Sequence, residues 1–355
     1  MATINKRGDF QWRAQVRRQG YPAQSKTFET REAAEKWARA IERELDIGLY
    51  VNRGPAEKNT LGDILKRYLD EVVPTHKGAD VEKIRINAIL KAKVSQLAMI
   101  ALTPAALAEW RDERLKAVAP ATVRRDLDII SAAINTARKD WGIHMDNPIL
   151  SMRRPKPSKA RERRLILDEE QRLLAALNNE ERDEHGHLGS GTRNPWIKPL
   201  VRLATETAMR RGELLSLTWD NIDLGEQTAY LPDTKNGTSR SVPLSMAAVT
   251  LLRALPRHLS GHVFPITEDS VKKAFTRALK RARETYEKEC GEALTKPDGR
   301  LLDLHFHDLR HEATSRIAEK LDNILELSAV TGHKDVRMLK RYYHPKASAL
   351  AKKLG

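Results

Sequence analysis

The strings TAMRRGE at 207–213 and HDLRH at 307–311 decide how this sequence is interpreted. Two others complete the pattern: TKNG at 234–237, with the Asn-Gly pair typical of a β-hairpin turn, and TGH at 331–333 followed by RYYH at 341–344. Around them apolar residues follow helical spacing, except beside TKNG, where they alternate. The pattern predicts a mostly α-helical C-terminal domain with a β-hairpin insert. Helices are expected over 168–177, 199–209, 269–289, 309–320 and 324–330, and strands over 228–231 and 239–244.

In this order and spacing, the strings resemble those of the tyrosine recombinase (phage integrase) family. The family pattern is an Arg after a T-G-x stretch, a Lys on a β-hairpin, H-x-x-R, a G-H pair, and a Tyr nine residues beyond that His, as from His333 to Tyr342 here. The resemblance covers about 161–355 and extends more weakly to the segments before it. It implies a tetramer on DNA, with no metal or other cofactor. The catalytic residues that it implies are Arg210, Lys235, His307, Arg310, His333 and Tyr342.

Strand exchange explains why these residue types belong together. A phosphodiester must be broken and remade, and a covalent protein–phosphate intermediate conserves the bond energy. Arg210 and Arg310 would bind the non-bridging oxygens, because a guanidinium is planar and stays charged. Tyr342 would be the nucleophile, and Lys235 the general acid for the leaving 5′ oxygen.

The other polar residues of the motifs have alternative roles. His307 and His333 would donate to phosphate oxygens or move the tyrosine proton. Glu213, on the same helical face as the first arginine, would orient an arginine or a histidine. Taken singly, each motif residue also has an ordinary structural role, such as a surface ion pair or a helix cap. A zinc site formed by His305, His307 and His311 is disfavoured, because the segment lacks the H-E-x-x-H arrangement.

Two adjacent tyrosines leave the nucleophile ambiguous. The family string R-Y-x-H, aligned with 341–344, selects Tyr342 and leaves Tyr343 at the variable position. The choice depends on register alone, so Tyr343 remains a competitor. The sequence also departs from the family pattern at Ala208, where glycine is frequent.

Composition indicates a polyanionic partner. The 355 residues include 63 Lys and Arg against 48 Asp and Glu, a net charge of +15 at pH 7. Nucleic acid is the first candidate and an anionic membrane the second, but no stretch approaches the ~20 apolar residues of a membrane-spanning helix. The N-terminal stretch lacks the apolar run of a signal peptide, and the single Cys290 excludes an internal disulfide. We expect a protein of the bacterial host cytoplasm that makes no membrane contact.

Charge and pattern divide this α+β multidomain chain into four parts. Residues 1–58 predict a small β-sheet-plus-helix module, which resembles the arm-type DNA-binding module of integrases. Residues 59–150 predict a helical core-binding bundle. Residues 151–164 carry 7 basic side chains and 1 acidic one, with two prolines, and are expected to be a linker that follows a phosphate backbone. Residues 165–355, with 30 basic and 27 acidic side chains, form the expected catalytic domain.

Basic side chains outside the motifs are candidates for DNA contact. A solvated surface is the ordinary alternative for each of them. On the expected helix 269–289, Arg277 and Arg281 lie one turn apart and would touch adjacent phosphates. The expected DNA-binding residues are Arg13, Arg17, Arg124, Arg125, Arg153, Arg154, Lys272, Arg277 and Arg281.

Together these expectations describe a site-specific DNA recombinase. It would integrate and excise a mobile element, a prophage or genomic island, at double-stranded attachment sites through a 3′-phosphotyrosine intermediate. The resemblance also implies a host DNA-bending protein and an excisionase as partners, and the tail at 348–355 would dock on a neighbouring protomer. A chromosome-dimer resolvase or a transposon recombinase of the same family is the nearest alternative, and the N-terminal module favours an integrase. A non-catalytic DNA-binding regulator is disfavoured by the complete set of motif residues.

Overall fold

The computed structural model divides the chain into two compact units, Met1–Lys159 and Ala160–Gly355, each with its own hydrophobic cores. No helix among its described residues is long and apolar enough to cross a membrane. The predicted α+β architecture with a helical majority is confirmed. The structure describes residues 2–48, 50, 52–158, 161–178, 191–232, 239–321, 323–343 and 351.

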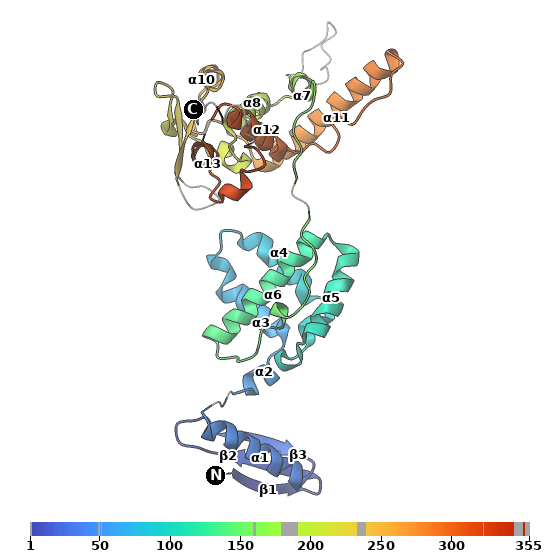
Figure 1. Ribbon diagram of the computed structural model, residues 1–355, viewed down its shortest axis with the longest axis vertical. Coiled ribbons are helices and arrows are strands. Elements are labelled where there is room, and N and C mark those ends of the chain that lie inside the picture. Colours follow the sequence, from blue (N-terminus) through green and yellow to red (C-terminus); the bar gives the residue numbers. More distant parts are fainter. Residues whose placement is uncertain are drawn as a thin grey trace. The chain divides into compact units, whose positions relative to one another are not determined.

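The first unit begins with an antiparallel sheet in the order β1-β2-β3 that packs against one helix (Figure 1). These elements are β1 (Ala2–Gly8), β2 (Gln11–Val16), β3 (Gln24–Phe28) and α1 (Arg31–Asp46). Ala14 and Val16 of β2 are buried with Ala34 and Ala38 of α1, as the alternating pattern predicts. The alternation of Phe10, Trp12, Ala14 and Val16 in the sequence predicts that all four share one face, but Phe10 is 80% exposed because the chain turns there between β1 and β2.

A helical bundle follows within the first unit. Its elements are α2 (Gly54–Lys58), α3 (Leu61–Glu71), η1 (Val73–Thr75), α4 (Ala79–Leu90), η2 (Lys93–Gln96), η3 (Met99–Ala101), α5 (Pro104–Ala117), α6 (Pro120–Asp140) and η4 (Pro148–Leu150). Thr60 and Asp63 form a capping box that starts α3. Asp126 of α6 is fully buried and accepts hydrogen bonds from Arg85 of α4 at 2.8 Å and Arg114 of α5 at 3.2 Å. One carboxylate therefore joins three helices.

The second unit is mostly helical and carries a small antiparallel sheet, β4-β5-β6. The hairpin is predicted correctly, but the short β4 adds a third strand. Among the helices, α8 packs against α12, and α11 extends past the rest of the unit (Figure 1). The elements are α7 (Glu169–Ala176), α8 (Ile197–Thr207), α9 (Arg211–Leu215), η5 (Trp219–Asn221), β4 (Ile222–Asp223), β5 (Thr228–Leu231), β6 (Arg240–Pro243), α10 (Met246–Arg253), α11 (Glu268–Glu292), α12 (Phe306–Ala318), α13 (Ile324–Thr331) and η6 (Val336–Met338).

Candidate active site

Two arginines share one buried carboxylate where α9 begins. The backbone N–H of Arg210 donates to Glu213 Oε2 at 2.8 Å, and Arg210 Nη1 donates to Oε1 at 2.7 Å. Arg240 of β6 donates to the same two oxygens at 3.0 and 2.8 Å. Burial opposes ionisation of Glu213, but the bonds from Arg240 and Arg210 outweigh it and lower its pKa to about 2. The ionised Glu213 therefore holds both guanidinium groups in place.

Arg310 of α12 is buried, with 4% of its surface exposed. Its Nη1 donates to the backbone carbonyl of Ala208 and its Nη2 to that of Thr331 at 2.6 Å, so it joins the ends of α8 and α13. Ala208 has a left-handed φ of +52°, which explains why glycine is frequent at this place in the family pattern. Burial and the nearby Arg210 charge lower the pKa of Arg310 to about 9, which leaves the guanidinium charged at neutral pH.

His333 lies beside Arg310, just after Gly332 ends α13. Its Nε2 is 3.5 Å from Arg310 Nη2, and its Nδ1 is 2.7 Å from Thr331 Oγ1. The Thr331 hydroxyl donates to the carbonyl of Leu327 at 2.7 Å, so Nδ1–H is the donor to Oγ1 and the lone pair of Nε2 faces the guanidinium. Burial and Arg310 lower the pKa of His333 to about 3, so its ring is neutral at pH 7.

Tyr342 lies beside α12, with its hydroxyl hydrogen-bonded to His311 Nδ1. The two rings stack with centroids 5.9 Å apart, and the exposed His307 meets the other histidine edge-on at 5.2 Å. Burial raises the pKa of Tyr342, although Arg341 and Arg310 act against the shift. The phenol is therefore protonated at neutral pH.

Arginines at the start of the second unit bind carboxylates of α12. Arg161 contacts Asp308 through two hydrogen bonds of 2.7 Å, and its backbone carbonyl accepts from Arg341 Nη1 at 3.4 Å. Arg164 donates to Glu312 at 3.1 and 3.3 Å. The beginning of the unit thus contacts both the helix that carries Arg310 and the segment that carries Tyr342.

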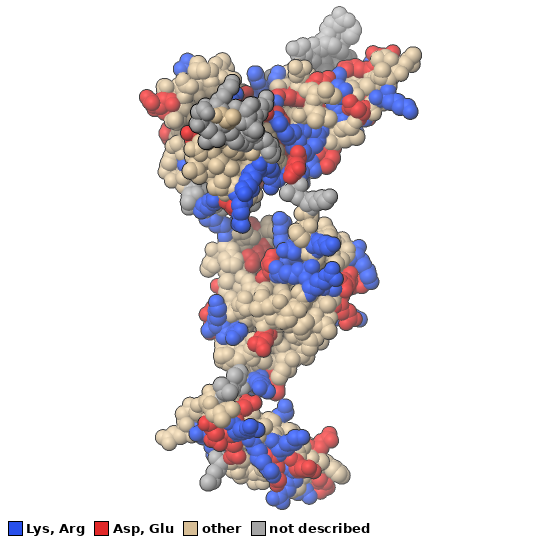
Figure 2. Space-filling model, viewed as in Figure 1, with Lys and Arg blue, Asp and Glu red and all other residues tan. Residues whose placement is uncertain are grey.

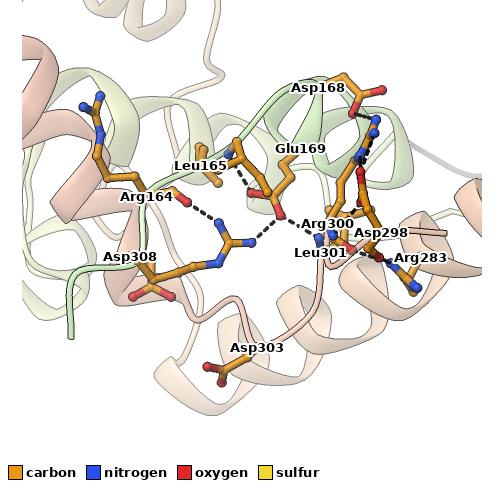
Figure 3. A network of polar contacts seen from close by, with 12 residues as sticks. Arg164, Leu165, Asp168, Glu169, Arg283, Asp298, Arg300, Leu301, Asp303 and Asp308 are labelled. Carbon is orange, nitrogen blue, oxygen red and sulfur yellow. Dashed lines mark hydrogen bonds and ion pairs between the residues drawn. The ribbon is translucent and has the colours of Figure 1, made fainter. Parts of the chain in front are cut away.

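A neighbouring network centres on Glu169, a fully buried residue of α7. It accepts a hydrogen bond from the Arg163 side chain and another from the Leu301 backbone N–H at 2.5 Å. Figure 3 shows Glu169 next to Leu301, with Arg300 bound to Asp298 beside them. The predicted linker therefore ends in arginines that bind protein carboxylates.

The structure groups five of the six predicted catalytic residues, and Lys235 lies outside the described residues. Arg210, Arg310, His333 and Tyr342 are linked by hydrogen bonds or by effects on one another's pKa, and His307 adjoins them through the His311 ring. An open cavity of about 750 Å³ has Arg210, His307 and Lys272 of α11 among its lining residues. Among the described residues, no group of three or more His, Cys, Asp or Glu side chains could hold a metal ion.

The sequence interpretation assigned no catalytic part to His311 or Arg240. His311 lies four residues after His307, a spacing that places both on one helical face. Arg240 lies two residues before the buried Val242, a spacing that places both side chains on the inward face of the strand. Both signals are present in the sequence, but each is as common in ordinary structural residues.

The expected DNA-binding side chains differ in how exposed they are. On the face in Figure 2, Lys and Arg form patches interrupted by Asp and Glu. Those that are exposed are Arg17, Arg125, Arg153, Lys272 and Arg277. The less exposed ones donate to protein atoms: Arg13 to Ser25 Oγ at 3.2 Å, Arg124 to the Pro155 carbonyl at 2.8 Å, Arg154 to Asp128 at 2.7 Å, and Arg281 to the Ala176 carbonyl at 2.7 Å.

Comparison with known proteins identifies this class of site. Residues 163–349 match the phage integrase family. The chain is 38% identical over 306 residues to the shufflon-specific DNA recombinase of Escherichia coli, covering 84% of this chain and 72% of that protein. It is 34% identical over 345 residues to a putative integrase/recombinase of Haemophilus influenzae, covering 97% and 87%.

The fold agrees with the sequence matches. It is similar to that of a lambda integrase tetramer bound to a Holliday junction, with a TM-score of 0.61 at 20% identity, over 96% of this chain and 94% of that one. The chain belongs to the phage integrase family. It is a site-specific DNA recombinase of the tyrosine recombinase type.

Proposed function

We propose that this recombinase integrates and excises a mobile element by forming a 3′-phosphotyrosine bond through Tyr342. The observation that carries the proposal is the uncompensated charge of Arg310. Its hydrogen-bond partners among the described residues are two backbone carbonyls and His333, rather than a carboxylate. A buried cation without an anionic partner is unfavourable, and a DNA phosphate would supply that anion.

Each group then has one role in the step. Arg210 and Arg310 bind the non-bridging oxygens and stabilise the charge of the transition state. Tyr342 Oη attacks phosphorus, and the 5′ oxygen leaves with a proton from Lys235. His307 binds a phosphate oxygen, and His333 does the same once the bound phosphate makes protonation of its Nε2 less unfavourable. The energy of the broken bond stays in the phosphotyrosine, so rejoining needs no nucleotide cofactor.

The contacts of Tyr342 support its role as the nucleophile. Its hydroxyl bonds to His311, whose neighbour in the chain is Arg310, and the Arg310 charge acts on its pKa.

The assembly on DNA extends from the same proposal. A tetramer would cut the four strands of two duplexes, with 1–58 on accessory sites, 59–150 and 165–355 on core DNA, and 151–164 between them. The exposed members of the expected basic set, Arg277 among them, would bind the DNA backbone, and a host bending protein and an excisionase would set direction. The protein would act on DNA in the bacterial cytoplasm.

The test is covalent trapping on a nicked duplex that loses its ligation partner once it is cut. The wild-type chain should form a protein–DNA adduct in the presence of a chelator, Tyr342→Phe should form none, and Tyr343→Phe should match the wild type. The reverse result for the two tyrosines overturns the assignment. Absence of any adduct favours a non-catalytic regulator, and chelator sensitivity favours a metal nuclease.

Recombination at a shufflon is a second candidate, favoured by the 38% identity to the Escherichia coli enzyme. A chromosome-dimer resolvase or transposon recombinase would use the same chemistry. Sequencing the DNA that the protein traps covalently in its host separates these functions. Ends of a mobile element support the first proposal, and trapped sites confined to a shufflon or to a chromosomal resolution site contradict it.

A further inference from the structure

His311 occupies a place that the catalytic set leaves unassigned. It follows Arg310 on α12 and lies between two ionisable rings. On one side its Nδ1 is hydrogen-bonded to Tyr342 Oη, with the rings stacked at 27°. On the other side His307 approaches it edge-on at 87°. Among the described residues, His311 is therefore a hydrogen-bond partner of the Tyr342 hydroxyl.

The protonation states fix the direction of this bond. Burial and His307 lower the pKa of His311 to about 4, with Arg341 and Arg310 adding to the shift and Asp308 opposing it. The ring is therefore neutral at pH 7, while burial keeps the phenol protonated. The tyrosine O–H consequently donates to the lone pair of Nδ1, which places the ring proton on Nε2.

Nucleophilic attack requires that this phenol proton leave. With an ordinary pKa near ~10, about one tyrosine in a thousand is ionised at pH 7, and burial reduces that fraction. A base must lie within hydrogen-bonding reach of the proton. Glu213 is committed to Arg210 and Arg240, and the Nε2 lone pair of His333 faces Arg310.

We propose that His311 accepts the phenol proton of Tyr342 during strand cleavage and returns it during rejoining. The inference rests on the proposed role of Tyr342 as the nucleophile. As the Oη–P bond forms and the P–O5′ bond breaks, the proton moves from Oη to Nδ1, and Lys235 protonates the 5′ oxygen. In the reverse step Lys235 takes back the proton of the 5′ hydroxyl as that oxygen attacks phosphorus. The Oη–P bond breaks, and the departing phenolate recovers its proton from Nδ1.

The surrounding charges make this base dependent on bound phosphate. An imidazolium at this position is disfavoured while the cations around it are uncompensated, and the negative charge of a phosphate in transition offsets them. His311 should therefore become a better base once DNA is in place. The ionisable groups that face it include His307, Asp308 and Arg310 on its own helix, His333 after α13, and Arg341 and Tyr342.

The experiment measures single-turnover adduct formation on the nicked duplex. His311→Asn keeps a hydrogen-bonding group near the position of Nδ1 but removes its basicity, and cleavage should fall about 10²–10⁴-fold. His258→Asn is the matched control, since that exposed histidine hydrogen-bonds to Ser260 at 2.9 Å, and it should cleave as the wild type does. DNA binding by both variants is measured in parallel.

Replacing Tyr342 by a ring-fluorinated tyrosine distinguishes proton transfer from positioning. Its more acidic phenol needs less help from a base, so cleavage by His311→Asn should be partly restored while the wild type changes little. Imidazole added to His311→Ala should restore cleavage in the same way. Three outcomes overturn the proposal. They are wild-type cleavage by His311→Asn, a cleavage defect that neither the fluorinated tyrosine nor imidazole relieves, and loss of DNA binding in both His311 variants. An adduct with Tyr342→Phe instead refutes the nucleophile assignment beneath it.

Discussion

Gly332→Ala tests how the site keeps its arginines in place. Gly332 has a φ of +68°, and a Cβ there would lie 2.5 Å from Arg240 Nη1 and 2.7 Å from its Cζ. The guanidinium would have to move away from Glu213, which it holds through two hydrogen bonds. Since Glu213 also binds Arg210, the change should reach an arginine that lies outside the clash.

The magnitude follows from two terms. A left-handed backbone costs an alanine about 1–2 kcal/mol, and loss of one charged hydrogen bond costs about 1.5–3 kcal/mol. The substitution should destabilise the second unit by roughly 2.5–5 kcal/mol, a large part of the ~5–15 kcal/mol typical of native proteins. Strand cleavage should fall as well under conditions in which the variant stays folded.

Denaturant unfolding of the full chain, with hydrogen exchange read at β6 and α9, measures both the size and the place of the effect. Gly261→Ala is the matched control, because Gly261 has a φ of +75° and its Cβ would meet nothing within 4 Å. It should show only the backbone term. In an Arg240→Ala background, Gly332→Ala should also cost no more than that term. Equal destabilisation by the two glycine substitutions in the wild-type background would refute the reasoning.

Three further outcomes are expected. The pKa of His333 is about 3 in the folded chain against its ordinary ~6.5, so between these pH values only the unfolded state binds this proton. Calorimetry should therefore show the free energy of unfolding falling as pH drops from 6.5, and falling less steeply in His333→Asn or with DNA bound. An unfolding midpoint that does not change with pH contradicts this prediction. Arg277→Gln should reduce the slope of log K for DNA binding against log[salt] by about 1. Arg281→Gln should leave that slope unchanged, because the Arg281 side chain donates to a backbone carbonyl of the protein. Equal slopes for the two variants would contradict this difference between the arginines. Asp126→Ala should destabilise the first unit by about 3–5 kcal/mol in denaturant unfolding, and a loss below 1 kcal/mol would show that its two arginines find other partners.

The sequence predicts local structure well where one physical signal dominates. Apolar periodicity identifies α6 and α11, and Thr-Pro at 103–104 marks the start of α5. Periodicity fails for β1, where most positions are exposed and polar, and for the two-residue β4. These two segments form strands because they pair with β2 and β5, and strand pairing is not a local property of the chain.

The motifs predict the grouping of the site but not its support. Arg210, Arg310, His333 and Tyr342 are found by ordered spacing, since each chemical role requires a particular residue type. Arg240 instead acts through a carboxylate 27 positions earlier in the chain, and that separation carries no periodic signal. The Arg161–Asp308 contact is likewise invisible before folding, because it joins residues 147 positions apart.

Burial and the charges of the site together explain why His311 and His333 are neutral before DNA binds. Arg210 and Arg240 share one carboxylate, Glu213, and the nearby Arg310 is bonded to two backbone carbonyls, so among the described residues the cluster retains positive charge. Burial and that charge both disfavour a proton on His333. A bound phosphate reverses the balance, because its oxygens satisfy the arginines and make nearby imidazolium groups less unfavourable. Phosphate binding and proton transfer are therefore electrostatically coupled. The phosphate that neutralises the arginines also makes the neighbouring histidines basic enough to move a proton.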